Sequence, residues 1–270
     1  MEGVINGKAK EDHHHHHEVE LSVWPLVVAV GAFLVPMAFM LAYSWGVRFL
    51  GLLVAGVAVG TLVVGLFGWV QEVHSKKQDG GLSKIAIMVF IVSEVALFGG
   101  LFGGYLYTML PEDIWPPAST PAGIPPLALA VLLSVFLLSS SGTMHMAEEK
   151  IEHGDLNGYK SWLIFTFILG GLFIAFMGLE WYKLISEEHF SISTNAYGTF
   201  FFTITGFHGS HVIVGLIMQL FLVILASQNR IGKKKLTFSK AAGLYWHFVD
   251  VVWLLVFSLM YVVPYFKVGQ

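Results

Sequence analysis

Among the protonatable side chains inside long apolar runs of this sequence, where charge is costly, five are candidates for function. They are Glu94, His208, His211, His247 and Asp250. A charged side chain at the centre of a membrane span costs on the order of 2.5 to 3.5 kcal/mol, so intramembrane ionisable groups are functional candidates by default. The chemistry open to carboxyl and imidazole groups in such places is proton binding and proton transfer.

Glu94 lies near the centre of the apolar run 83–110. It is about twelve residues from a Gly-Gly break, so in a helix it would lie roughly 18 Å deep, near the middle of a bilayer. Its helix face also carries Phe98, Leu101 and Tyr105. The opposite face carries Gly99, Gly100, Gly103 and Gly104. Small residues at this spacing favour close helix contact. We therefore expect Glu94 to face a cavity, a cleft or a looser neighbour. A protonated, purely structural Glu94 is the alternative.

His208 and His211 are three residues apart on one face of another apolar run. That face also holds Thr205, Gly215 and Gln219. Two neutral imidazoles at this spacing could ligate a metal, but a metal site needs a third ligand and a second shell. The sequence has no HExxH motif or comparable partner, so we predict no metal site, no cofactor-binding residue and no catalytic residue.

His247 and Asp250 are also three residues apart, on one face of the last apolar run. A carboxylate one helical turn from a histidine can fix the tautomer of the imidazole. The pair is either a satisfied polar contact between helices or part of a proton relay. Glu180, before Trp181 and Tyr182, is expected near the outer membrane interface, as an anchor or in a bond between helices.

Seven apolar segments must position these groups. Their approximate limits are 21–43, 49–70, 83–110, 125–147, 161–186, 197–226 and 241–266. The 270 residues are 56% hydrophobic and only 12% charged, which indicates a polytopic, all-α membrane protein with seven transmembrane helices. The short joint between the first two segments predicts that they form an antiparallel pair.

The net charge of -3 gives no reason to expect nucleic acid as a partner, and the absence of cysteine excludes disulfides and thiolate sites. The polar first twenty residues do not resemble a secretory signal peptide.

The distribution of basic residues predicts the orientation. With the amino terminus in the cytoplasm, twelve of the fifteen lysines and arginines fall in inner segments and three in outer segments. The outer three are Arg48, Lys183 and Lys267. This bias predicts a cytoplasmic amino terminus and an external carboxyl terminus. The basic inner loop 227–240 either reports this orientation or attracts anionic lipid. The proline-rich outer loop after the third segment is predicted to be an ordered cap anchored by Trp115.

The polar tail 1–20 contains five consecutive histidines: His13, His14, His15, His16 and His17. They could chelate a metal, buffer protons near the membrane or be a purification tag. Because the tail is predicted on the cytoplasmic side, our hypothesis is that it is a proton-collecting antenna.

Several runs resemble subunit III of the haem-copper terminal oxidases, the cytochrome c oxidase family. They are SEVALF at 93–98, WPP at 115–117, SGTMHMA at 141–147, YGTFFFTITGFHGSHVIVG at 197–215 and YWHFVDVVWLLVF at 245–257. They occur in the family's order, and the last two are long and specific. The first 69 residues match in hydropathy alone.

The resemblance implies an accessory core subunit of a respiratory oxidase that reduces O2 to water and pumps protons. It implies no redox cofactor in this chain, haem and copper in partner subunits, and direct docking on subunit I. Helices 1 and 2, in 21–73, would splay from the helix 3–7 bundle, in 74–270, across a V-shaped cleft that holds phospholipid. The family's intramembrane glutamate matches Glu94. The implied role is to sustain proton uptake and to protect the oxidase from turnover-linked inactivation, in a bacterial inner membrane.

The sequence departs from the family at two places. Trp69-Val70-Gln71-Glu72 stands where Trp-Trp-Arg-Asp is common, and Glu148-Glu149 stands where a His-His pair is common. Both changes affect expected lipid-headgroup contacts at the inner surface. The rival interpretations are a proton-coupled seven-helix transporter or channel using Glu94, His208 and Asp250, and a seven-helix receptor. The chain shows no inverted repeat, which disfavours the transporter. Neither the electron donor nor the haem type is encoded here.

Overall fold

The computed structural model describes residues 23–44, 46–75, 80–228, 231 and 233–267. The elements in this part of the chain are all helical. They belong to two compact units, Met1–Gln78 and Asp79–Gln270. The histidines His13 to His17 lie outside the described residues, as does the rest of the tail.

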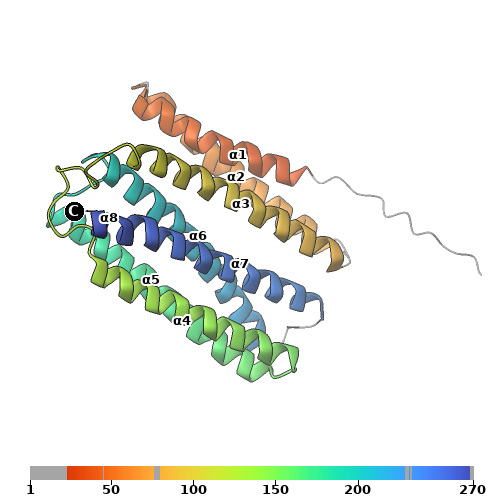
Figure 1. Ribbon diagram of the computed structural model, residues 1–270. Helices are drawn as coiled ribbons and strands as arrows, with labels where there is room; N and C mark the ends of the chain where they lie inside the picture. Colours follow the sequence, from red (N-terminus) through yellow and green to blue (C-terminus); the bar gives the residue numbers. More distant parts are fainter. Residues whose placement is uncertain (1–22, 45, 76–79, 229–230, 232, 268–270) are drawn as a thin grey trace, which may run out of the picture. The chain divides into compact units, whose positions relative to one another are not determined.

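The first unit is a pair of helices. Helix α1 covers Trp24–Phe39 and continues into the π-helical turn η1, Met40–Ser44, and α2 covers Arg48–Ser75. The two helices lie side by side and run in opposite directions (Figure 1), as the short joint predicts. A Cβ atom on Gly31 would come within 2.9 Å of Leu62, so this glycine permits the close approach of α1 and α2.

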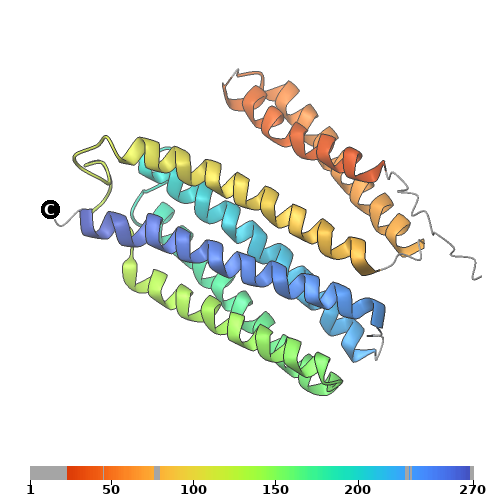
Figure 2. The same ribbon diagram turned by 45° about the vertical axis from the view of Figure 1, so that its right-hand side comes forward.

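The second unit is a bundle in which α7 has a central place. Its helices are α3 (Gly80–Met109), α4 (Leu127–Glu152), α5 (Leu156–Ser186), α6 (Ala196–Ser227), α7 (Lys233–Phe257), η2 (Ser258–Val262) and α8 (Val263–Lys267). Helix α7 contacts α3, α4 and α6, and α5 pairs with both α4 and α6 (Figures 1 and 2). The histidine and the aspartate of α7 are therefore within reach of several helices.

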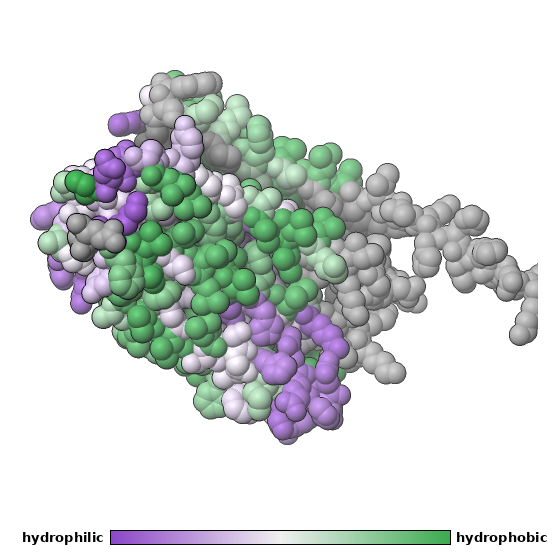
Figure 3. All heavy atoms as spheres, viewed as in Figure 1, coloured by the Kyte–Doolittle hydropathy of each residue, from purple (hydrophilic) through white to green (hydrophobic). Residues whose placement is uncertain are grey.

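Among the described residues, six helices are long and apolar enough to cross a membrane, and the chain is a multi-pass membrane protein. The apolar part of the first predicted segment is shorter, at Leu26–Ala42. Several helices continue beyond the apolar runs: α4 ends at Glu152 and α7 begins at Lys233. The backbone hydrogen bonds of a helix form whether its side chains are polar or apolar, so a helix can continue into polar residues. The length of an apolar run therefore underestimates the length of its helix. Figure 3 shows apolar side chains over the sides of the bundle and hydrophilic ones at the turn between α4 and α5.

Aromatic side chains fill the core of the bundle. Trp246 and Trp253 of α7 are fully buried, and Trp246 lies where Cβ atoms on Gly170 and Gly215 would overlap with its ring. The two tryptophans donate hydrogen bonds to serines of α4, from Trp246 to Ser140 and from Trp253 to Ser134. Small residues on α5 and α6 thus make room for α7, as expected for membrane helices.

The loop between α3 and α4 is anchored as predicted, although its anchor lies in the bundle. Trp115 is 1% exposed and donates a hydrogen bond to the Tyr105 hydroxyl at 3.0 Å. Tyr105 in turn donates to the carbonyl oxygen of Leu259 in η2 at 2.9 Å. The loop is also held by Asn195, which donates to Ser119 and Thr120.

Candidate functional site

Glu94 of α3 and His211 of α6 form a hydrogen-bonded pair between helices. The Oε2 atom of Glu94 lies 2.9 Å from Nε2 of His211. The other ring nitrogen, Nδ1, lies 2.8 Å from the carbonyl oxygen of Phe207, to which it donates. With Nδ1 protonated, the Glu94–Nε2 contact needs one further proton, carried by either the carboxyl group or the imidazole. The pair is therefore a proton-holding unit inside a membrane span.

Aromatic rings close this pair off from water. The rings of Phe98 and Phe207 have their centres 5.2 and 4.7 Å from that of His211. The ring of Tyr245 stacks on the imidazole at 6.5 Å, and its hydroxyl donates to the backbone carbonyl of His211. The side chains of Glu94 and His211 are each 11% exposed. This low exposure favours neutral partners sharing the proton over two separated charges.

The close helix contact expected at the glycine face of α3 is not found among the described residues of the bundle. Within the described residues of the bundle, the Glu94 face of α3 is the packed face, since Phe98 contacts Phe207 and Tyr105 contacts Phe200. The glycine face is the open one: a Cβ on Gly99, Gly100 or Gly103 would meet nothing within 4 Å. Large aromatic side chains on the Glu94 face reach the neighbouring helices, so close backbone approach is not needed there.

His208 lies in a different environment from His211, although both are on α6. It is fully buried, with the rings of Phe173 and Trp253 at 5.7 and 5.2 Å. Neither of its ring nitrogens has a hydrogen-bond partner among the described residues. Both histidines contact α7, but His208 lies toward Phe173 of α5 whereas His211 lies toward Glu94 of α3, so they do not converge on one site. In the described part of the chain, no group of three or more His, Asp or Glu side chains is arranged to hold a metal ion.

His247 is bonded to α4 and not to Asp250. Its Nδ1 lies 2.9 Å from the Ser141 hydroxyl, and its Nε2 lies 3.5 Å from Oε2 of Glu148. Asp250 is 4% exposed, and neither of its carboxyl oxygens has a hydrogen-bond partner in the part of the chain that the structure describes. The expected His247–Asp250 contact is therefore replaced by contacts from His247 to another helix.

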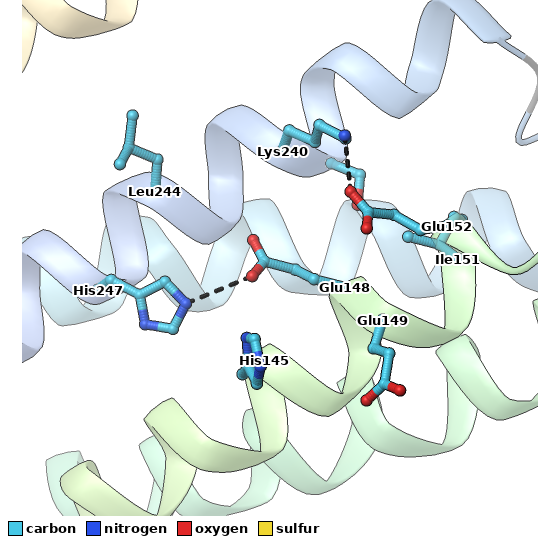
Figure 4. A pocket seen from close by; sticks show the side chains of 9 residues that line it. His145, Glu148, Glu149, Ile151, Glu152, Lys240, Leu244 and His247 are labelled. Atoms are coloured by element: carbon cyan, nitrogen blue, oxygen red, sulfur yellow. Dashed lines mark hydrogen bonds and ion pairs between the residues drawn. The ribbon is translucent and has the colours of Figure 1, made fainter.

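The sequence analysis missed Ser141 and Glu148 as partners of His247. The signal that could have found them is their spacing: Ser141, His145 and Glu148 stand at positions i, i+4 and i+7, on one face of α4. Figure 4 shows Glu148 of this face directed toward His247, with Lys240 of α7 bonded to Glu152 of α4 one turn further along.

Glu180 takes part in a bond between helices, one of the two roles expected for it. It is 1% exposed, and its Oε2 accepts a hydrogen bond of 2.9 Å from the Tyr261 hydroxyl in η2. Its Oε1 has no partner among the described residues. Glu180 is thus a core residue of α5 and not part of an exposed interfacial belt.

These observations define a class: a polytopic helical membrane protein whose buried carboxyl groups and histidines meet side chains of neighbouring helices. The family model described as "Cytochrome c oxidase subunit III" matches residues 14–265. The chain belongs to this family.

Curated relatives agree over most of the chain. A probable cytochrome c oxidase subunit 3 of Nocardia farcinica is 37% identical over 194 residues, which cover 72% of this chain and 93% of the relative. The cytochrome c oxidase subunit 3 of Synechocystis sp. is 35% identical over 70% of this chain and 79% of the relative. That of Xenopus laevis is 32% identical over 90% of this chain and 95% of the relative. The protein is accordingly the accessory subunit III of a multi-subunit haem-copper oxidase, a respiratory-chain enzyme.

Proposed function

We propose that this chain docks directly on the catalytic subunit I of its oxidase, holds phospholipid and sustains proton uptake by that subunit. By keeping protons available, it protects the complex from inactivation during turnover. Haem and copper are assigned to the partner subunits. Membership of the family favours this role over the transporter and receptor interpretations.

The observation that carries the proposal is the Glu94–His211 pair. Its 2.9 Å contact requires a proton between a carboxyl oxygen and a ring nitrogen within the apolar span Met88–Met109. Ionisable side chains are rare in apolar segments that span a membrane, and those that occur there are functional by default. Glu94, His211, His208, His247 and Asp250 are the residues to which we assign proton-uptake support or contact with the lipid cleft.

The proposed membrane arrangement has seven spans, with the first two splayed from the other five across a lipid-holding V-shaped cleft. The proposed divisions are the tail 1–20, helices 1 and 2 in 21–73, and helices 3 to 7 in 74–270. The bias in basic residues supports a cytoplasmic amino terminus and an external carboxyl terminus. The membrane is proposed to be a bacterial inner membrane. The histidines of the tail are proposed to collect protons on the cytoplasmic side.

The first test is to purify the oxidase through this chain in mild detergent. A haem spectrum and stoichiometric larger subunits are expected, whereas a haem-free preparation of this chain alone would refute the assignment. In that complex, Glu94→Gln removes an ionisable group but keeps the shape. The expected result is an unchanged initial rate with fewer turnovers before half of the activity is lost.

The matched control is Glu112→Gln, a change of the same kind at an exposed residue between α3 and α4. It is expected to behave like the wild type. If Glu94→Gln also keeps the wild-type number of turnovers, Glu94 has no part in protection. For the tail, replacement of His13 to His17 by serine is expected to slow proton uptake, and unchanged uptake rates and pH dependence would exclude the antenna.

A further inference from the structure

The ends of α4 and α7 enclose a pocket that is open to the surroundings. It has a volume of about 420 Å³, and its lining includes His145, Glu148 and His247. Figure 4 shows the Glu148 carboxylate and the His247 ring directed toward each other, whereas Glu149, which also lines the pocket, is directed away from His247. The side chains of Glu148 and His247 are 26% and 33% exposed, so water can reach both groups.

A line of polar groups leads from this pocket into the membrane span. Glu148 Oε2 lies 3.5 Å from His247 Nε2, and His247 Nδ1 lies 2.9 Å from the Ser141 hydroxyl. Asp250 is one helical turn from His247 on the same face of α7, and its carboxyl oxygens make no hydrogen bond among the described residues in this conformation. Four groups therefore follow one another from the pocket to a buried acid.

Asp250 is a suitable end point for such a line. It is 4% exposed, and both of its carboxyl oxygens lack a hydrogen-bond partner among the described residues. A buried carboxyl group without a partner is less costly with its proton than without it.

Gly243 of α7 leaves the space in which the Glu148 side chain contacts His247. A Cβ atom on this residue would overlap with the Glu148 carboxylate. An alanine at this position would therefore require the Glu148 side chain to move. Gly243 thus allows Glu148 to lie against α7 within reach of His247.

We propose that Glu148, His247, Ser141 and Asp250 form a proton path from the pocket at the α4–α7 end to a proton-storing carboxyl group in the span. A proton from water binds Glu148 and passes to Nε2 of His247. The imidazole releases its Nδ1 proton to the Ser141 oxygen, while the hydroxyl of Ser141 rotates and gives its own proton to the Asp250 carboxylate. One proton enters at Glu148 and one arrives at Asp250. Glu148 is again a carboxylate and Ser141 a hydroxyl, whereas His247 is left protonated on Nε2 and must return its proton to Nδ1, by a ring flip, before the next transfer.

This proposal deepens the proposed function, because it names the route by which two of the assigned residues would support proton uptake. It can nevertheless be measured separately. The infrared carbonyl band of a protonated carboxyl group shifts when its proton is exchanged for deuterium, so the exchange of Asp250 can be followed after transfer of the purified oxidase into D2O. Asp250→Asn identifies the band, since it removes that band alone.

The expected result is a band that disappears in Asp250→Asn and exchanges quickly in the wild type. Glu148→Gln and Ser141→Ala are expected to slow the exchange by about tenfold or more, because each removes a proton-transfer step. Gly243→Ala keeps every titratable group and displaces Glu148, so it is expected to slow exchange as well. Copurification with haem-containing subunits verifies that each variant is assembled.

The matched control is Glu149→Gln, next to Glu148 in sequence but directed away from His247 (Figure 4). Its exchange rate is expected to equal that of the wild type. Absence of an Asp250-dependent band, or wild-type exchange in both Glu148→Gln and Gly243→Ala, would overturn the proposal. Slow Asp250 exchange in Glu148→Gln and Gly243→Ala, with a normal number of turnovers, would retain the path and refute its role in protection. Normal exchange in these two variants, together with early inactivation of Glu94→Gln, would refute the path and retain the proposed protection.

Discussion

The Glu94–His211 pair and the Glu148–His247 pair contain the same two chemical groups in different surroundings. The first pair has a contact of 2.9 Å, and each side chain is 11% exposed. The second has a contact of 3.5 Å, with side chains 26% and 33% exposed. In the first, the remaining ring nitrogen is fixed by a backbone carbonyl of its own helix, whereas in the second it contacts a serine hydroxyl of another helix.

The difference shows that neighbours, and not the two groups themselves, decide what such a pair can do. Aromatic rings close the first pair, so its proton has no evident route to water. A pocket opens the second pair to water, and a hydroxyl offers the next step inward. A closed pair is suited to holding a proton, and an open pair is suited to exchanging one.

The largest expected coupling free energy is that of the closed pair, Glu94 and His211. A double-mutant cycle with Glu94→Ala and His211→Ala should give a coupling free energy of about 1 to 2 kcal/mol, as for strong hydrogen bonds between membrane helices. It can be measured by SDS titration of the purified oxidase in mixed micelles. Ser93→Ala is the control, because the Ser93 hydroxyl bonds only to a carbonyl of its own helix. A coupling near zero would mean that the contact does not stabilise the bundle.

A double-mutant cycle on the open pair, Glu148 and His247, should give a smaller coupling free energy. Glu148→Ala with His247→Ala is expected to give about 0.5 kcal/mol or less, because a long contact between partly exposed groups is weakened by water. The SDS titration compares the two cycles directly. If the open pair proved as strongly coupled as the closed one, exposure would not explain the difference between them.

The smallest net effect on stability is expected for Gly243→Ala. Alanine gains up to about 1 kcal/mol of helix propensity over glycine, and the displacement of the flexible Glu148 side chain offsets part of it. The free energy of unfolding should therefore change little, while the Glu148–His247 contact is lost. Gly103→Ala is the matched control on α3, since its Cβ would meet nothing within 4 Å. Severe destabilisation by Gly243→Ala would show that Glu148 cannot move aside.

The sequence predicts the helical architecture well, because membrane spans follow from a single property, the length of an apolar run. Six of the seven predicted runs lie in helices long enough to cross a membrane. The ends of the helices are predicted less well. The polar residues of α4 after 147 and of α7 before 241 remain helical although they fall outside the apolar runs.

The candidate site is predicted in its residues but not in its contacts. Apolar surroundings identify Glu94 and His247 as unusual, but their partners are 117 and 99 residues away in sequence. Helical spacing gives the face of a residue and not the helix that covers it. The glycines of α3 illustrate this limit, since their pattern indicates a surface for close contact but not whether the bundle itself fills that surface.

The π-helical turn η2 gathers hydrogen bonds from three other parts of the bundle. Tyr105 of α3 donates to the carbonyl of Leu259, Tyr197 of α6 donates to that of Met260, and Tyr261 donates to Glu180 of α5. These acceptors and this donor follow α3, α5 and α6 in the sequence and are therefore synthesised after them. The Tyr105 hydroxyl that accepts from Trp115 finds its own acceptor, Leu259, only after η2 has been synthesised. A chain that stopped before residue 258 would lack all three of these bonds, and the loop would keep only its bonds to Tyr105 and Asn195.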